Sequence, residues 1–89
     1  MYEILRTRQL KRDVKLAQKR GRDTGCLRTV IETLAQGQTL PAKYRDHQLK
    51  GAFKDCRECH LEAHWLLVYR IEGNVLQLVR TGTHSDLFR

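Results

Sequence analysis

The chain has 89 residues, with 17 lysines and arginines against 10 aspartates and glutamates, which gives a formal net charge of +7 at pH 7. A hydrophobic fraction of 40% is typical of a globular protein and excludes a disordered chain, while the length indicates one domain over residues 1–89. A small domain this basic favours polyanionic partners, which are nucleic acid, an anionic membrane or an acidic protein.

Neither a membrane span nor a secretion signal is visible in the sequence. No apolar run approaches the roughly 20 residues that cross a bilayer, and the N-terminus lacks the apolar stretch of a signal peptide. The three cysteines, Cys26, Cys56 and Cys59, are an odd number, which disfavours the disulfide framework of a secreted protein. We therefore expect a cytoplasmic protein with no membrane partner.

The N-terminal part of the chain predicts a strand and then a helix. Residues 2–6 have the composition of a short strand. In residues 8–20, Leu10, Val14 and Ala17 recur at the i, i+4, i+7 spacing of one helix face, and basic residues occupy much of the rest. A merely solvated helix face would carry the same charges.

A second helix is expected after Gly21. Asp23 or Thr24 can cap its N-terminus, and Gly37 is a typical residue for its end. Its apolar face has the i, i+3, i+4, i+7 spacing and consists of Leu27, Val30, Ile31 and Leu34. The two helices should form a hairpin with facing apolar stripes.

After a connector that contains the only proline, the periodicity changes to that of strands. The connector is residues 38–44, and the expected strands, the first of them a strand or an extended arm, are residues 45–49, 55–61, 65–71 and 75–83. Short turns between the later strands imply antiparallel neighbours. The sequence therefore predicts an α+β fold, in which an N-terminal strand and a two-helix hairpin pack on a curved antiparallel β-sheet.

All four histidines lie in two stretches, residues 46–69 and 80–88. They are His47, His60, His64 and His84. Histidine is the side chain whose unperturbed charge change falls near neutral pH, so histidines beside many cations indicate acid–base chemistry on an anionic substrate. Strand alternation supports part of such a cluster, because Glu58 and His60 would point to the same face of a strand.

Many residues of these stretches occur together in one known family. They are His47, Leu49, Gly51, His60, Leu61, Trp65, Tyr69, the run from Arg80 to His84, Leu87 and Phe88. With this combination and its order of strand, helices and sheet, nearly the whole chain resembles the YafQ branch of the RelE-like toxins. The resemblance implies a RelE-like fold and a toxin of a type II toxin–antitoxin pair, which enters the ribosomal A site and cuts mRNA. It also implies a cognate antitoxin that wraps the toxin, contact with operator DNA only through the antitoxin complex, and no cofactor.

The resemblance places the family's site histidines on His47, His60 and His84, and its terminal aromatic residue on Phe88. Two other positions depart from the family pattern. Glu58 stands where an aspartate is usual, and His64 replaces an aspartate just before the tryptophan. Because the second change removes a carboxylate, the role of that position does not carry over unchanged. Trp65 and Tyr69 are expected in the core.

Histidines can cut RNA without a metal. A base removes the proton of the 2′-OH, which attacks the adjacent phosphorus, an acid protonates the leaving 5′ oxygen, and cations stabilise the developing charge. We assign His47 as the base and His84 as the acid, although these roles can be exchanged among the imidazoles. His60 and His64, with Glu58, would orient groups or stabilise charge.

Four cations are candidate RNA contacts: Lys50, Lys54, Arg57 and Arg80. Arg80 would hold the scissile phosphate, and Phe88 could stack on an unstacked base. Each of these two residues has a structural alternative. Arg80 could pair with Glu62 or Glu72, and Phe88 could fill the core.

Two other functions are compatible with parts of the sequence. A non-catalytic basic nucleic-acid-binding module would have the same charge, although it has no need of clustered histidines. The run from Cys56 to His60 also matches C-x-x-C-H, a haem attachment signature, and with His64 it resembles zinc-ligand spacing. We expect no metal there, because Cys56 and Cys59 are an odd step apart and point to opposite faces of a strand, one buried and one exposed.

Overall fold

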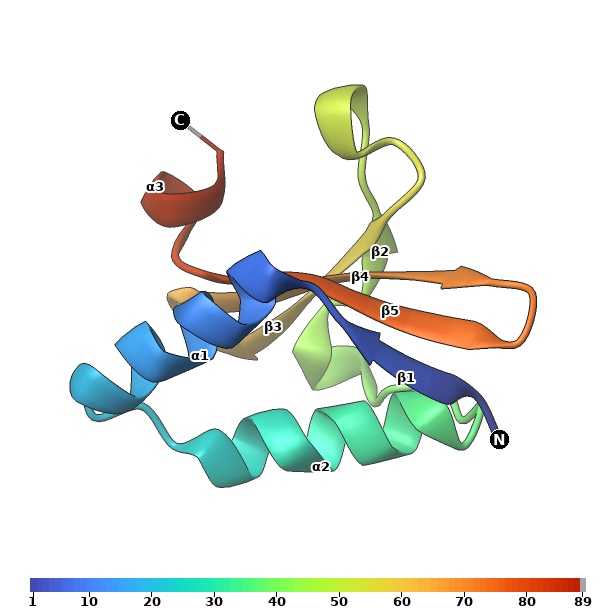
Figure 1. Ribbon diagram of the computed structural model, residues 1–89, viewed down its shortest axis with the longest axis horizontal. Helices are drawn as coiled ribbons and strands as arrows, with labels where there is room; N and C mark the ends of the chain where they lie inside the picture. The colour runs from blue at the N-terminus through green and yellow to red at the C-terminus, as the bar shows by residue number, and fades with distance from the viewer. Residues whose placement is uncertain (89) are drawn as a thin grey trace.

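The computed structural model describes residues 1–88 and has the predicted α+β architecture (Figure 1). The regular elements, in chain order, are β1 Glu3–Arg6, α1 Arg8–Lys19, α2 Thr24–Ala35, β2 His47–Gln48, β3 Arg57–Glu62, β4 Trp65–Glu72, β5 Val75–Gly82 and α3 His84–Leu87. Two short 3-10 turns, η1 at Ala42–Tyr44 and η2 at Gly51–Phe53, flank β2. No helix among residues 1–88 has the length and apolar character needed to cross a membrane.

The strands form one five-stranded sheet in the order β1-β5-β4-β3-β2. The neighbours from β2 to β5 are antiparallel, as expected, but β1 runs parallel to β5, with Glu3 opposite Val75 and Arg6 opposite Leu78. The sequence did not indicate that β1 joins this sheet as a parallel edge strand. A parallel pair requires a long connection, and here the entire chain between β1 and β5 supplies it.

Both long helices begin at a capped residue. The Thr7 hydroxyl accepts a hydrogen bond from the Leu10 amide and donates one to the Val79 carbonyl, so it fixes the start of α1 to β5. The Asp23 carboxylate accepts from the Gly25 amide, which identifies the cap of α2 as Asp23 rather than Thr24.

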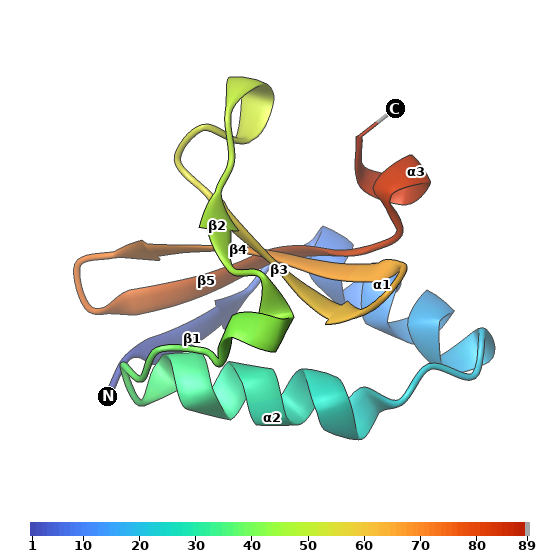
Figure 2. The same ribbon diagram turned by 180° about the vertical axis from the view of Figure 1, so that it is seen from behind.

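The main core lies between the sheet and helices α1 and α2, which cover one face (Figure 2). Trp65 and Tyr69 are fully buried there, as predicted. On β5 a bulge places Val68 opposite Arg80 but Tyr69 opposite Leu78. The extra residue, Val79, shifts the alternation of β5 by one position. Leu78 therefore belongs to the main core, whereas Arg80 pairs with Val68, which faces the other side of the sheet.

The opposite face carries α3 and the η2 turn (Figure 1), and a smaller apolar cluster lies there. The buried members of this cluster are Cys56, Leu66, Val68 and Leu87. Cys56 therefore lies on the face opposite to Cys59, which belongs to the main core, as strand alternation predicted. Both cysteines are nevertheless buried, at 7% and 0% exposure, so the expectation that one would be exposed was wrong. Burial raises the pKa of the Cys59 thiol to about 12.

Helix α3 was not expected from the sequence. Its cap is reciprocal, because the Thr83 hydroxyl accepts from the Asp86 amide while the Asp86 carboxylate accepts from the Thr83 amide. The spacing Thr83-x-x-Asp86 is visible in the sequence as a capping signature. The helix turns the chain back over the sheet, so His84 and Phe88 do not continue the line of β5.

Candidate active site

Three histidines from three different elements surround one buried carboxylate. His47 comes from β2, His60 from β3 and His84 from the start of α3, and Glu58 of β3 is only 2% exposed. The His47 Nε2 lies 3.1 Å from Glu58 Oε2, while His84 Nε2 and His60 Nε2 lie 3.6 and 4.0 Å from Oε1. A buried carboxylate is costly unless it is paired. His47 is its near partner at Oε2, whereas Oε1 has no hydrogen bond from residues 1–88 and has only the more distant imidazoles of His84 and His60 beside it.

Sheet register explains why these side chains meet. His47 pairs with Glu58, and Glu58 pairs with Val68, so all three point to the face that carries α3. His60 lies two residues further along β3 and shares that face, as predicted, while the intervening Cys59 enters the main core. The ring centroid of His60 lies 6.2 Å from that of His47 and 6.2 Å from that of His84.

A main-chain carbonyl group orients the ring of His47. Its Nδ1 lies 2.7 Å from the carbonyl oxygen of Arg45, and since a carbonyl can only accept, Nδ1 must be the donor. Arg45 has a positive φ of 51°, unlike any other non-glycine residue of the described chain. In the neutral ring of this tautomer, Nε2 carries the free lone pair, and it lies 3.1 Å from Glu58 Oε2.

His60 is the most enclosed of the three rings. Burial lowers its pKa below the ordinary value, and the carboxylate of Glu58 acts in the opposite direction, whereas Arg45, His47 and His84 lower the pKa further. Protonation of His60 therefore disfavours the folded state. The corresponding contribution to stability is present above the ordinary histidine pKa and is lost as the pH falls from that value through the lowered pKa of the folded state.

We expect the His60 ring to titrate below pH 6.5, the ordinary histidine pKa, and to titrate lower still in Glu58→Gln, because that variant removes the charge that raises its pKa. The ring Cε1–Hε1 signals in NMR spectra recorded across pH measure both midpoints. Exposed His64 serves as an internal reference in the same spectra. A His60 midpoint that is unchanged in Glu58→Gln would contradict the proximity of these two side chains.

Helix α3, which carries His84, is anchored by contacts absent from the sequence prediction. Arg20 at the end of α1 donates to the Asp86 carboxylate at 2.8 Å. This bond and the cap at Thr83 hold the pKa of Asp86 well below its usual range. A Cβ atom at Gly82 would lie 3.0 Å from Asp86 atoms, tighter than an ordinary contact, so a larger residue here would have to displace the Asp86 side chain.

Phe88 closes the same side of the site. Its ring packs edge-on against Phe53 of η2, with ring centroids 5.5 Å apart, and its centroid lies 5.5 Å from that of His84. The ring is half-buried against the smaller apolar cluster. Phe88 thus lies beside the histidines and also joins α3 to the η2 turn.

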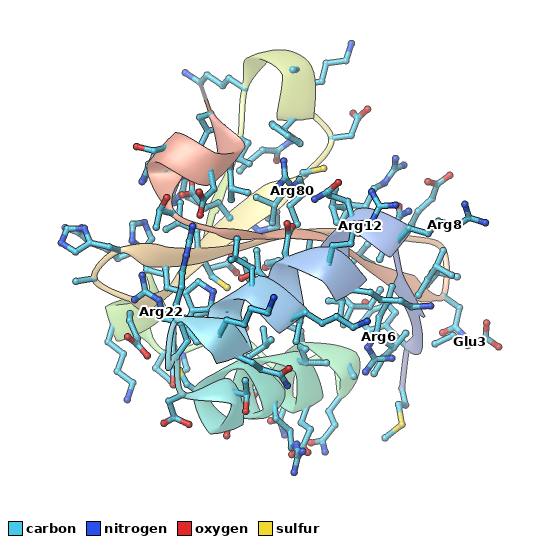
Figure 3. All side chains as sticks on the ribbon, turned by 60° about the vertical axis from the view of Figure 1, so that its left-hand side comes forward. Glu3, Arg6, Arg8, Arg12, Arg22 and Arg80 are labelled. Atoms are coloured by element: carbon cyan, nitrogen blue, oxygen red, sulfur yellow. The ribbon has the colours of Figure 1, made fainter. Side chains whose placement is uncertain are left out.

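Arg80 is paired with Asp13, a residue far from it in the sequence. Its Nε and Nη2 donate to the two carboxylate oxygens of Asp13 on α1, at 3.1 and 3.0 Å, and this bond raises its pKa. The suggested pairing with Glu62 or Glu72 was therefore wrong. Arg80 lies on the side of the sheet that carries α3, and it remains 26% exposed (Figure 3).

The other predicted RNA contacts are not all near the histidines. Lys50 and Lys54 flank η2 and are exposed. Arg57 of β3 instead pairs with Tyr69 of β4, so its side chain leaves the sheet on the face that α1 and α2 cover. Its Nε donates to Asp46 at 3.1 Å, and the same Asp46 oxygen accepts from the Tyr69 hydroxyl at 2.7 Å. The structure therefore does not bring Arg57 together with the histidines, although its partner Asp46 immediately precedes His47.

The structure does not bring His64 into the cluster. It lies in the turn between β3 and β4 and is exposed. Among the hydrogen bonds, ion pairs and ring contacts of residues 1–88, none joins it to His47, His60 or His84. The expectation that His64 would orient a neighbouring imidazole thus has no structural support. His64 follows the end of β3, so it is not one of the β3 side chains that face the site.

Known proteins resemble this chain over nearly its whole length. Residues 2–89 match the family model described as the bacterial toxin of type II toxin–antitoxin system, YafQ. The mRNA interferase toxin YafQ of Escherichia coli strain K12 is 43% identical over 81 residues, which cover 90% of this chain and 88% of that relative.

Solved structures agree in fold with this chain. YafQ in the E. coli DinJ–YafQ complex is 39% identical, with a TM-score of 0.93 and full coverage of both chains. A metal-bound toxin from Helicobacter pylori is 47% identical, with a TM-score of 0.92 over 99% of this chain and 100% of that one. Sequence and structure thus agree that the chain belongs to the YafQ family of bacterial type II toxin–antitoxin toxins.

Proposed function

We propose that the protein is an mRNA interferase, an endoribonuclease that cuts mRNA on the ribosome and is neutralised by a cognate antitoxin. The observation that carries the proposal is the group of three imidazoles around buried Glu58, on the sheet face that α1 and α2 do not cover. The relatives support the same activity, since curated family members are mRNA interferase toxins and one solved relative is in complex with the antitoxin DinJ. Action on translating ribosomes implies a cytoplasmic location.

The proposed mechanism transfers two protons and uses no metal. Nε2 of His47, once unprotonated, accepts the proton of the 2′-OH, and the resulting oxyanion attacks phosphorus. His84, in its protonated form, donates its proton to the 5′ oxygen as the P–O bond breaks, leaving a 2′,3′-cyclic phosphate. Glu58 keeps the two imidazoles close to a negative charge, which stabilises whichever of them is protonated. His60 completes the group as a neutral ring at neutral pH, because its pKa is lowered.

The cations near the site have separate proposed roles. Arg80 contacts the scissile phosphate through the Nη1 donors that lie outside its bond to Asp13. Lys50 and Lys54, on either side of the η2 turn, contact neighbouring phosphates. Phe88 stacks on an exposed base beside His84. This last role requires one face of the Phe88 ring to be open to the base while the ring keeps its nearly perpendicular contact with Phe53.

We expect the 5′ fragment of cut mRNA to end in a 2′,3′-cyclic phosphate or a 3′-phosphate. The attacking oxygen is the adjacent 2′-OH, so the phosphate remains on that fragment. Mass spectrometry of the fragment, or its response to phosphatase before ligation, identifies the end. The His47→Ala variant under the same conditions controls for contaminating nucleases.

A 3′-hydroxyl end would refute the histidine mechanism. Binding of ribosomes without any cleavage would instead favour the alternative of a non-catalytic nucleic-acid-binding module.

A further inference from the structure

A cavity of about 400 Å³ lies beside the histidine cluster, at the open edge of β3. Strand β2 pairs only with Arg57 and Glu58, so the edge of β3 that faces away from β4 has no strand partner from Cys59 onward. The η1 turn crosses this gap instead. The residues that line the cavity include Cys26, Lys43, Arg45, His60 and Glu62. Its volume falls within the range of about 300–1,000 Å³ that is typical of small-molecule pockets.

The basic residues of the cavity are free to bind an anion. Lys43 and Arg45 are exposed, and neither forms an ion pair with a carboxylate of residues 1–88. The Lys43 Nζ lies 5.1 Å from the centre of the Tyr44 ring, which restrains its position without neutralising it. Two unpaired cations at one wall form a natural site for a phosphate group.

The carboxylate of Glu62 also lines the cavity, and a carboxylate can only accept hydrogen bonds. Glu62 bonds on one side to Arg22 at 3.4 Å and stays partly exposed. The pKa of the Cys26 thiol on the cavity wall is raised by burial and then by the charge of Glu62, which places this carboxylate close to Cys26. A carboxylate accepts from base amino groups such as that of cytosine. Uracil offers only an N–H between two carbonyls, whose oxygens would repel it.

His60 belongs both to the histidine cluster and to the wall of this cavity. A nucleotide bound in the cavity would therefore adjoin a phosphate placed at the cluster. We propose that the cavity holds the nucleotide next to the scissile phosphate of the mRNA. Lys43 and Arg45 bind its backbone phosphate, and Glu62 favours a base with an amino group over uracil. This inference rests on the proposed function and adds a substrate subsite to it.

A first experiment measures binding to the free toxin. The probes are adenosine 5′-monophosphate and uridine 5′-monophosphate, with inorganic phosphate as the control, and the observable is the set of amide shifts of the 15N-labelled protein. We expect shifts at residues 43–45 and 60–63, with the adenosine probe binding about tenfold more tightly, the value of one charge-assisted hydrogen bond. Glu62→Gln should reduce this preference, and Lys43→Ala should weaken both nucleotides. Equal affinities in the wild-type protein, or shifts confined to other surfaces, would overturn the proposal.

A second experiment separates this inference from the proposed function. Ribosomes programmed with codons that differ at one nucleotide are cut by wild type, by Glu62→Gln and by Glu3→Gln. The last variant is the matched control for charge, because Glu3 is exposed on β1 and does not line the cavity. We expect wild type and Glu3→Gln to disfavour uridine at one position beside the cut, and Glu62→Gln to lose that preference. If wild type cuts and Glu62→Gln keeps the same preference, the subsite is refuted. If wild type cuts no codon, the proposed function fails, while nucleotide binding is judged by the first experiment alone.

Discussion

Replacement of His47 or His84 by alanine is expected to slow mRNA cleavage by about 10²–10⁴-fold, the usual contribution of one positioned proton-transfer group. Both imidazoles face Glu58 through Nε2, at 3.1 and 3.6 Å, and each is exposed to an approaching phosphodiester. Single-turnover cleavage of mRNA on programmed ribosomes measures the chemical step. Melting temperatures of the same variants confirm that the fold is retained.

The matched control is His64→Ala, which removes an exposed imidazole that contacts none of the other three histidines. We expect this variant to keep most of the cleavage rate. If His64→Ala abolished cleavage while His47→Ala and His84→Ala were mild, the allocation of roles would be wrong, and His64 would be the main proton-transfer residue.

The second large effect is expected on stability, in Asp13→Ala. This carboxylate is 7% exposed and accepts from two nitrogens of Arg80, from the Thr81 amide at 3.1 Å and from Gln9 at 3.0 Å. Its removal leaves the Thr81 amide and the Arg80 guanidinium without their acceptor. We expect a loss of about 3 kcal/mol in the free energy of unfolding, the lower end for a broken buried pair, since Arg80 retains some contact with water.

Thermal unfolding measures this effect, and for a domain of this size such a loss lowers the melting temperature by roughly 12–24 °C. Asp55→Ala is the matched control, because Asp55 is exposed and its removal should leave the melting temperature nearly unchanged. Equal melting temperatures for the two variants would show that the bond between α1 and β5 contributes little. A stable Asp13→Ala protein with altered cleavage would instead assign Asp13 a role in holding Arg80 for catalysis.

Local features of the fold could be predicted from the sequence because they depend on neighbours along the chain. Helix periodicity gave both long helices, and Asp23 is one of the two caps that were considered. Strand alternation placed Cys56 and Cys59 on opposite faces, and it placed Glu58 and His60 on the same face. The burial of Cys56 could not be predicted, because its cover comes from distant parts of the chain, including Leu87 of an unexpected helix.

The site could be predicted only in part, for the same reason. Its histidines came from family resemblance, since nothing in their spacing shows that His47, His60 and His84 converge. The contacts that position them join residues far apart in the chain, such as Arg20 with Asp86 and Arg80 with Asp13. Spacing along a sequence does not reveal such pairs. His64 illustrates the opposite error, because it is four residues from His60 and yet a turn separates it from the cluster.

The placement of the two chain ends has a practical consequence for handling the protein. Met1 is exposed next to β1, whereas α3 lies on the far side of the molecule (Figures 1 and 2). An affinity tag fused before Met1 would extend away from the histidines. The same tag after α3 would emerge beside Phe88 and His84, whose rings are in contact. Preparations tagged at the C-terminus can therefore appear inactive for reasons unrelated to the chemistry of the site.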